Sequence, residues 1–333
     1  MYTLKDIARM AGVSPTAVSF YINNRAKTFN LSDATCQKIQ KVIDECNYRP
    51  NFHARAIKNR CTCLIGVLVH NIASSFYAEL LQGIETELRS HNYYMILAET
   101  LNDVEQEERE LSFMTELGVD GCIIAPCRDY TVNNHVYAPE ILQNKPCINI
   151  LSGGNGLPVF DTDHTVGAGM VADAFLKAGH RKLAYFGESL PTDLRHAMAE
   201  RYNSFKAHIE AAGGTVEAFF DLEELVRRYR EFTGVFCFYD RMAVKLAQAM
   251  KKQGIRIPQD ISICGYGNEL VLTEFIDFKL TTVHECKGEL GQLAAQSLLE
   301  KLANPNFKIE MLNRMKPKFI PGETILNIET APR

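Results

Sequence analysis

From Cys63 onward, short apolar segments alternate with segments of helical periodicity, and this alternation limits the possible folds more than any other feature. Two of the helical segments are FYAELLQGIETELRS and DRMAVKLAQAMKKQG. Strands that alternate with helices form parallel sheets that are covered by helices on both faces. A single sheet of so many strands would be unusually large, so we expect two lobes. The expected strands are CLIGVLV, YYMILA, GCIIAP, CINI, KLAYFG, GVFCFY, ISICGY and LTTV.

The first sixty residues differ from the rest of the chain in their charge. They contain ten Lys and Arg residues and four Asp and Glu residues, a formal charge of +6, whereas the whole chain carries −4. The remaining residues of the 333 must therefore carry −10. A basic segment on an acidic body is typical of a nucleic-acid contact made by one end of a protein. A solvated charged face is the alternative.

Two short helices joined by a glycine turn are predicted close to the N-terminus. Thr3 can cap the first helix, with Asp6 completing a capping box, and Gly12 can end it. Ser14 and Pro15 suit the N-cap and the first position of the next helix. Two helices joined in this way form a helix-turn-helix. The inner face of the first helix is expected to hold Leu4, Ile7, Ala8 and Ala11.

The second helix is expected to bury one face and to offer the other to DNA. Three of the four outer residues are small and polar, so they can approach base edges and phosphates. The fourth, Phe20, can pack on a thymine methyl group or, alternatively, fold back onto the neighbouring helices. The outer residues are Thr16, Ser19, Phe20 and Asn23, and the inner residues are Ala17, Val18, Tyr21 and Ile22.

A third helix is predicted to start at Ser32, with Leu31 and Cys36 in the positions of a hydrophobic staple. Asn47 can close this helix in the left-handed conformation. Its expected core face contains Cys36, Ile39, Val42, Ile43 and Cys46.

The stretches TLKDIARMAGVSPTAVSFYIN and LSDATCQKIQKVIDECNYRPNFHARAIKNR resemble the headpiece and hinge of the lactose repressor family. The likeness includes the AGVS turn, the VS of the second helix and the segment NYRPN. Two features depart from the family. Phe20 stands where an arginine often reads a guanine, and the loop between Asn23 and Leu31 is longer than that of the lactose repressor. The resemblance implies DNA contacts by Thr3, Ser14, Pro15, Thr16, Ser19, Phe20 and Asn23.

After Pro50, the segment NFHARAIKNR can form one short helix that is capped by Asn51. The resemblance implies that two such hinge helices, one from each subunit of a dimer, pair in the minor groove. Ile57 would then be the wedge between base pairs. Arg55 and Lys58 would face phosphates. A plain charged linker is the alternative.

The stretches GVLVHNIASSFYAELLQGIE, VDGCIIAP, DAFLKAGHRKLAYFG, IPQDISICGYG and LTTVHEC resemble the core of the same family, which is similar to periplasmic sugar-binding proteins. The implied fold is α/β: an all-α helix-turn-helix headpiece and a two-lobed core of parallel sheets flanked by helices. The chain would cross between the lobes near Phe160, near Val283 and at 313–316. The implied divisions are a headpiece at 1–48, a hinge at 49–62 and a core at 63–333, with lobe 1 at about 63–159 and 284–313 and lobe 2 at about 160–283 and 314–330.

Ligands of such a core bind at the carboxyl ends of the strands, in the crevice between the lobes. Arg201 stands where family members hold a polar group of the effector. Tyr239 and Gly267 replace the family's usual Asn and Asp. The resemblance therefore favours an anionic or ring-shaped effector, such as a sugar acid, sugar phosphate or nucleobase, gripped by Arg201 and Asp163. An ordinary sugar, held with the help of Asn268, is the alternative. The implied crevice residues are Phe76, Tyr77, Asp163, Arg201, Tyr239, Asp240, Gly267 and Asn268.

Motifs of catalysis or metal binding are missing from the sequence. It contains no Walker phosphate loop, no G-x-S-x-G elbow and no H-E-x-x-H. Cys61 and Cys63 have no second pair nearby, and we expect the ten cysteines to be reduced, as in the cytoplasm. The N-terminus does not resemble a signal peptide, and no apolar run is long enough to span a membrane.

We therefore expect a cytoplasmic, dimeric repressor that binds a pseudo-palindromic DNA operator and responds to a small polar effector, without catalysis, cofactor or metal. The alternative is a free-standing solute-binding protein or sugar-related enzyme with an incidental basic extension. Whether the ligand is an inducer or a co-repressor, and whether the protein is a dimer or a tetramer, stays open at this point.

Overall fold

The computed structural model describes residues 2–22, 25–48, 61–127, 137, 142–153, 156–188, 197–269 and 278–329. The chain divides into two compact units, Met1–Cys63 and Leu64–Arg333. Five residues predicted to touch DNA lie outside the described part of the chain. They are Asn23, Asn51, Arg55, Ile57 and Lys58.

The first unit contains the predicted helix-turn-helix, made of α1 (Leu4–Ala11) and α2 (Pro15–Ile22). The capping box is confirmed, because Thr3 accepts from the Asp6 backbone and the Asp6 carboxylate accepts from the Thr3 backbone. Gly12 ends α1 in the left-handed conformation, with φ of 64°. The Ser14 hydroxyl accepts from the backbone N–H of Ala17 at 3.1 Å, as an N-cap does. These local signals set both ends of the turn.

The third helix, α3 (Asp33–Glu45), completes the headpiece. Ser32 caps it, with its hydroxyl oxygen 3.2 Å from the backbone nitrogen of Thr35. Asn47 follows with φ of 43°, the predicted left-handed closure. The three helices enclose a small core of Ile7, Ala8, Ala11, Val18, Ile39 and Val42.

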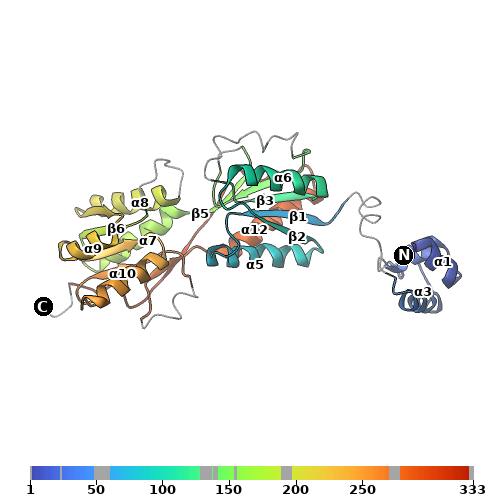
Figure 1. Ribbon diagram of the computed structural model, residues 1–333, viewed down its shortest axis with the longest axis horizontal. Coiled ribbons are helices and arrows are strands. Elements are labelled where there is room, and N and C mark those ends of the chain that lie inside the picture. The colour runs from blue at the N-terminus through green and yellow to red at the C-terminus, as the bar shows by residue number, and fades with distance from the viewer. Residues whose placement is uncertain are drawn as a thin grey trace. The chain divides into compact units, whose positions relative to one another are not determined.

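The second unit begins with a lobe built on a six-stranded parallel sheet of order β11-β5-β4-β3-β1-β2. Figure 1 shows α5 (Ser75–Ser90) and α12 (Lys287–Ala303) on one face of this sheet and α6 (Val104–Leu117) on the other. The strands are β1 (Leu64–Val69), β2 (Tyr94–Glu99), β3 (Gly121–Ile124), β4 (Cys147–Ile150), β5 (Val159–Thr162) and β11 (Leu312–Met315).

Glycines allow α5 and α12 to pack with their backbones close together. A Cβ added to Gly83 of α5 would overlap the carbonyl oxygen of Gly288, and one added to Gly291 of α12 would overlap that of Leu80. The two helices thus bury a continuous apolar face against the sheet, although more than 200 positions separate them in the chain.

The second lobe is a four-stranded parallel sheet of order β7-β6-β8-β9, with helices on both faces. Its core is rich in aromatic residues, among which Phe205 and Phe236 have ring centroids 4.9 Å apart. The strands are β6 (Lys182–Phe186), β7 (Thr215–Phe219), β8 (Gly234–Cys237) and β9 (Ser262–Cys264). The helices are α7 (His164–Lys177), α8 (Ala197–Ala211), α9 (Leu222–Arg228) and α10 (Asp240–Lys252), followed after α9 by the 3₁₀ turn η2 (Tyr229–Glu231).

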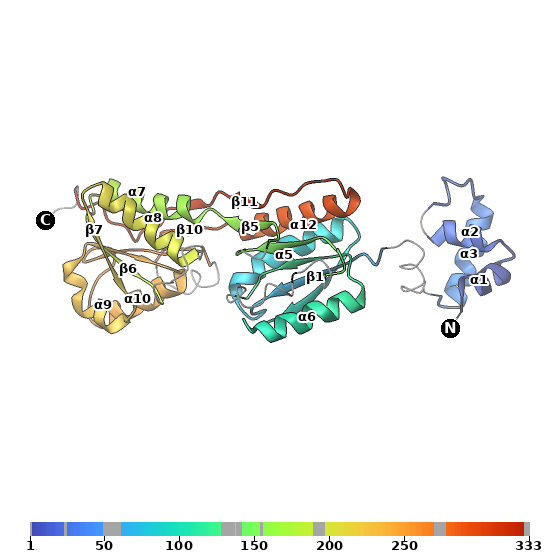
Figure 2. The same cartoon turned by 90° about the horizontal axis from the view of Figure 1, so that it is seen from above.

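The chain passes between the two lobes at three places. Figure 2 shows β5, β10 (Thr282–His284) and β11 where the lobes meet. Because β5 belongs to the first sheet through Thr162, the first passage comes a few residues after the expected position near Phe160. The second lies between β10 and α12, and the third between β11 and β12 (Lys318–Ile320), which pairs antiparallel with β10.

None of the helices in the described part of the chain is both long enough and apolar enough to cross a membrane.

Candidate nucleic-acid interface and ligand crevice

Four of the residues predicted to touch DNA lie on the surface of the headpiece. Thr3, Ser14, Pro15 and Thr16 are all exposed, at the starts of α1 and α2. The N-terminal ends of helices present backbone N–H groups, which suit phosphate oxygens. The structure therefore leaves these residues available for contact with a nucleic acid.

Ser19 does not lie on the outer face of α2, as the helical periodicity had predicted. It is only 8% exposed, next to the fully buried Val18. The reason is that α2 packs against both α1 and α3. A larger part of its surface is therefore buried than in a helix that packs on one side only. The expectation that Ser19 faces outward is wrong.

Phe20 packs in a way that neither of the two interpretations had described. Its ring is stacked on that of Phe29, with the centroids 3.4 Å apart and the planes 4° from parallel. Phe29 belongs to the loop between α2 and α3 and is 46% exposed. Phe20 therefore packs on the longer loop, rather than on a neighbouring helix, and the two rings form an apolar surface beside α2.

The guanidinium of Arg201, on α8, lies at the centre of a buried network in the second unit. Nε is 3.2 Å from Nδ1 of His164, Nη1 donates to the carbonyl of Phe238 at 3.0 Å, and Nη2 donates to Glu285 at 2.5 Å. The guanidinium carbon also lies 3.8 Å from the ring centroid of Tyr266. Arg201 is only 2% exposed. The resemblance implied that Arg201 grips an anionic effector, whereas in the structure other groups of the chain already bind its guanidinium.

Glu285 joins the two lobes through the same network. Its carboxylate binds Arg201 of the second lobe and lies 3.8 Å from the ammonium of Lys287, at the start of α12 in the first lobe. Its carbonyl accepts from the hydroxyl of Thr162 at 3.1 Å, which ties the second passage to the first. The Lys287 ammonium lies 4.6 Å from the ring centroid of Phe76. Burial opposes the charged carboxylate, yet Arg201 and Lys287 together hold the pKa of Glu285 below its usual value.

His164 is a neutral member of this network. Burial, and next the charge of Arg201, lowers its pKa to about 3. Nδ1 lies 3.2 Å from both Nε of Arg201 and the hydroxyl of Tyr266, so we assign it as the acceptor. Nε2 then carries the proton and lies 3.6 Å from the carboxylate of Asp161. His164 is thus a fixed hydrogen-bonding group over the physiological pH range.

Asp240, predicted to line the crevice, is fully buried at the start of α10. One carboxylate oxygen accepts from the hydroxyl of Thr282 at 2.6 Å, and the other from the backbone N–H of Glu269 at 2.8 Å. Burial raises its pKa to about 6. The preceding residue, Tyr239, is half-buried with its ring against that of Phe238. Asp240 therefore links the turn that follows β9 with the neighbouring strand β10.

That turn contains the predicted residues Gly267 and Asn268, which both have positive φ, of 121° and 52°. The turn directs Glu269 toward the first lobe, where its carboxylate accepts from the hydroxyl of Ser75 at 2.9 Å. Ser75 precedes the predicted Phe76, and the buried ring of Tyr77 packs edge-on against that of Phe76. The crevice residues of the two lobes are thus brought together at this point.

Asp163 caps α7, since its carboxylate accepts from the backbone N–H of Val166 at 3.0 Å. It also lies 3.7 Å from the guanidinium of Arg314 on β11. Arg314 in turn binds Glu200 of α8 through two bonds, of 3.0 Å and 2.6 Å. Asp163 is therefore a helix cap at the edge of a second ion-pair cluster between the lobes.

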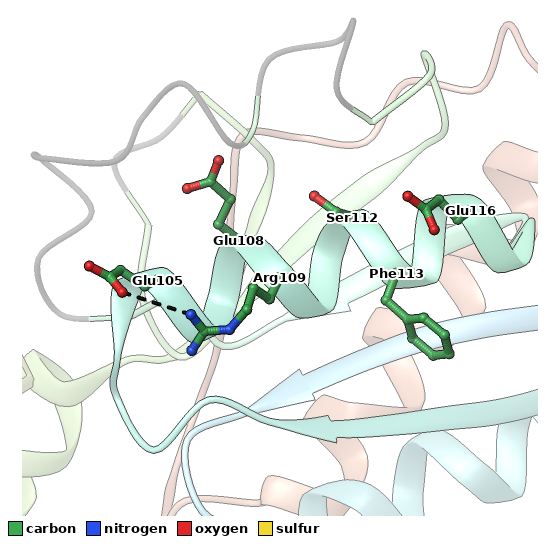
Figure 3. A pocket seen from close by; sticks show the side chains of 6 residues that line it. All are labelled: Glu105, Glu108, Arg109, Ser112, Phe113 and Glu116. Atoms are coloured by element: carbon green, nitrogen blue, oxygen red, sulfur yellow. Dashed lines mark ion pairs between the residues drawn. The ribbon is translucent and has the colours of Figure 1, made fainter.

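Two further features of the second unit lie apart from this network. A hollow of about 630 Å³ runs along the outer face of α6, where Figure 3 shows Glu108, Ser112 and Glu116 on one side of the helix and Phe113 on the other. Near β10, potential metal ligands lie close together, but Lys318 supplies a cation there, 2.9 Å from Glu289. This cluster consists of His284, Cys286 and Glu289.

Two of the buried charged residues of this network, Glu285 and Lys287, were not among the predicted crevice residues. Glu285 and Lys287 follow directly after the predicted strand LTTV and His284. Charged side chains immediately past the carboxyl end of a buried strand were the signal that could have identified them. His164 and Tyr266 likewise follow strands, β5 and β9.

Comparison with protein families matches two parts of the chain. Residues 3–51 match the model described as bacterial regulatory proteins, lacI family. Residues 172–325 match a periplasmic binding protein-like domain.

Curated relatives and solved structures match the chain over nearly its whole length. It is 31% identical to the HTH-type transcriptional repressor PurR of Vibrio atlanticus, over 98% of this chain and 99% of the relative. It is 30% identical to the ribose operon repressor of Haemophilus influenzae, over 99% and 100%. A structure of the lac repressor dimer bound to operator and the anti-inducer ONPF shares the fold, with a TM-score of 0.82, 20% identity and coverage of 98% and 99%. A regulator of the same family from Enterococcus faecium, with bound ribose, has a TM-score of 0.67 and 28% identity, over 80% of this chain and 99% of that one.

Proposed function

The chain belongs to the lacI family of bacterial regulatory proteins, and from this premise we propose how it acts. It is a DNA-binding transcription repressor whose activity is modulated by an effector of the periplasmic-binding-like core. We assign it no catalytic reaction. We place its action in the cytoplasm, because an operator-binding protein acts where the chromosome is.

The capped helix-turn-helix within a basic segment is the observation that carries the proposal. The starts of α1 and α2 expose small polar residues, which suit phosphates and base edges. We propose that residues 1–48 are the DNA-binding headpiece, 49–62 the hinge and 63–333 the sensing core. The proposed DNA contacts are Thr3, Ser14, Pro15, Thr16, Phe20 and Asn23 in the headpiece and Asn51, Arg55, Ile57 and Lys58 in the hinge.

The proposed active form is a homodimer that is joined through the first lobe. Strand β2 is an edge strand, and its Tyr94 is 68% exposed. On the neighbouring α6, Phe113 (Figure 3) is 55% exposed. Leu117 of the same helix is also exposed. An edge strand beside exposed apolar side chains is a surface that a monomer avoids and a dimer buries. The related lac repressor is itself described as a dimer on its operator.

The proposed effector site lies between the lobes, at the carboxyl ends of β1, β5, β8 and β9. The related proteins are named transcriptional repressor PurR and ribose operon repressor, and one solved relative holds ribose. For this chain we propose a small polar effector that is contacted by Phe76, Tyr77, Tyr239 and Asn268. Arg201 and Asp240 would position the elements that carry these groups, through their bonds to Phe238 and to the backbone of Glu269, and Asp163 and Gly267 would shape the edges of the site.

Selection of operators from random DNA by the purified chain tests the proposal. The expected product is an inverted repeat, because a two-fold symmetric dimer reads two equivalent half-sites. Deleting residues 1–60 should abolish DNA binding and leave the core folded. Recovery of asymmetric sites alone, or of no sites at all, would contradict the dimeric repressor.

A hinge variant tests the proposed wedge separately. Ile57→Ala should weaken operator binding more than binding to random DNA, because a wedge acts only on a kinked site. Lys58→Ala is the matched control, and it should weaken both and reduce the salt dependence. Equal losses for Ile57→Ala on the two DNAs would instead indicate a plain linker.

A further inference from the structure

Each of the three nitrogens of Arg201 is already hydrogen-bonded within the chain, which leaves at most one N–H on each terminal nitrogen for a ligand. Its three nitrogens are engaged by His164, by the carbonyl of Phe238 and by Glu285. Tyr266 covers one face of the guanidinium, and the Phe238 ring lies 4.6 Å from its central carbon. A guanidinium can bind a carboxylate through two parallel bonds, and here Glu285 already holds one of the two terminal nitrogens.

The position of Glu285 is set by the backbone and not by a flexible side chain alone. It lies in the short segment between β10 and α12, and its carbonyl is bonded to Thr162. Its side chain and that of Arg201 are 4% and 3% exposed. A buried charge is strongly destabilising unless it is paired, so each of these two groups requires the other.

A second cation, Lys287, also indicates that the carboxylate of Glu285 stands where a ligand would bind. Lys287 is itself buried, 3.8 Å from the second oxygen of Glu285, and its ammonium faces the ring of Phe76. One carboxylate thus lies between an arginine of the second lobe and a lysine of the first. This is the arrangement that an anionic ligand would be expected to complete in a two-lobed binding protein.

We propose that Glu285 is a tethered carboxylate that takes the place of an anionic ligand on Arg201. The inference rests on the proposed function, because it concerns the effector crevice of a repressor. Since the guanidinium is already neutralised, a sugar acid or sugar phosphate gains nothing from it. The effector of this chain is instead a molecule that donates hydrogen bonds to carboxylates, a neutral polyol or an amine.

The other carboxylates around the crevice agree with this charge preference. Asp161 faces His164 from β5, and Glu269 reaches the first lobe through Ser75. Asp240 lies behind Glu269, bonded to its backbone. A site with these groups attracts hydrogen-bond donors and repels anions.

Chemical rescue of Glu285→Ala in the full-length chain tests the proposal. The variant leaves two buried cations and a space of carboxylate size. We expect its melting temperature to fall by roughly 10 °C, since one partner of a buried ion pair is lost. Sodium formate should restore several degrees more than sodium chloride at equal ionic strength, whereas the wild-type chain should respond equally to the two salts.

A matched control and a second variant keep the test decisive. Glu289→Ala removes an exposed glutamate four positions away, and it should show little change and no preference for formate. Should Glu285→Ala fail to fold, Glu285→Ser leaves a similar space and provides the same readout. The double variant Arg201→Met, Glu285→Met should melt above Glu285→Ala and lose the formate response.

The outcome that overturns the inference is an identical response of the folded single variant, Glu285→Ala or its substitute, to formate and chloride. Operator binding by the wild-type chain is measured in parallel by gel shift. Loss of operator binding with an intact formate rescue would contradict the proposed repressor function alone. Normal operator binding without rescue would contradict the tethered carboxylate alone.

Discussion

The headpiece and the crevice of this repressor are built in opposite ways. In the headpiece, the bonds that define the turn join residues three positions apart, such as Thr3 with Asp6, and the polar side chains at the helix starts face outward. In the crevice, the bonds join residues far apart, Arg201 with Glu285 across 84 positions, and the polar groups face one another. The headpiece therefore leaves polar side chains exposed at its surface, whereas the polar groups of the crevice are buried and bonded to one another.

This difference determines what each region can recognise. An exposed, locally fixed surface loses little stability when a contact residue is exchanged, so its specificity can change without loss of the fold. A buried network couples recognition to folding, since removing one charge leaves its partner unpaired. We therefore expect substitutions in the crevice to affect stability first and substitutions on the headpiece surface to affect specificity first.

The largest effect expected from this comparison is that of Arg201→Met. Loss of the guanidinium leaves Glu285 buried with only the more distant Lys287, which should cost about 3–5 kcal/mol of the free energy of unfolding. Urea denaturation followed by circular dichroism measures this loss. Arg256→Met is the control, because Arg256 pairs with Asp260 on the surface, and its transition midpoint should hardly move. Equal shifts of the transition midpoint for the two variants would contradict the expected difference between the buried and the surface ion pair.

The next effect concerns pH and the buried carboxyl of Asp240. Its pKa is raised to about 6 in the folded chain, so it contributes stability that is present below its ordinary pKa of 3.8 and is lost as pH rises through 6. Through this group, the unfolding free energy of the wild-type chain should fall by about 2–3 kcal/mol between pH 4 and pH 7. Asp240→Asn should not show this fall. Glu285 acts in the opposite sense, because its lowered pKa gives stability that is lost on acidification. Parallel pH profiles for wild type and Asp240→Asn would contradict this.

A smaller effect is expected at the exposed aromatic pair of the headpiece. Phe20→Arg should shift operator preference toward guanine at one position of each half-site, by about 1–3 kcal/mol, because arginine bonds guanine O6 and N7 together. Phe29→Ala removes the other ring of the stack and serves as the control, without a new preference for guanine. Operator selection with both variants measures the shift. If both variants only lower headpiece stability, the ring pair is structural.

The smallest effect is expected from the helix caps. Ser32→Ala removes the acceptor for the backbone N–H of Thr35 and should cost the headpiece about 1 kcal/mol. Amide exchange of the headpiece should rise, while that of the second unit stays unchanged. A comparable loss of protection in the core would show that the two units do not unfold separately.

The sequence predicted best those elements whose signals are local or uniformly apolar. The eight expected strands correspond to β1, β2, β3, β4, β6, β8, β9 and β10, most of them buried along their whole length. Four strands were missed, because β5 and β7 alternate in burial and β11 and β12 are partly exposed and polar. The missed strands β5, β11 and β12 lie at the passages between the lobes, where one sheet ends and the other begins.

The sequence predicted where the candidate site lies, but not which groups bind Arg201 there. The position of Arg201 was expected from the family resemblance, yet its partner lies on a segment that no local pattern connects with α8. Burial of charge is a property of the assembled lobes, so a single side chain in the sequence does not reveal it. The orientation of Ser19 was mispredicted for a related reason, since it depends on the packing of α2 against two other helices.

The first lobe is built from two separate stretches of the chain, and this determines the order in which the parts of the protein can fold on the ribosome. The helices of the headpiece end at Glu45, and the fully buried core of the second lobe lies between Ala168 and Val283, to which β12 is added from near the end of the chain. The first lobe, in contrast, needs α12 and β11, which are translated about 130 residues or more after β5. At about 5–20 residues per second, a nascent chain carries a finished headpiece for some ten seconds or longer before its sensor closes. The headpiece can therefore fold while the transcript is still being read, whereas the first lobe, through which the proposed dimer is joined, is completed last.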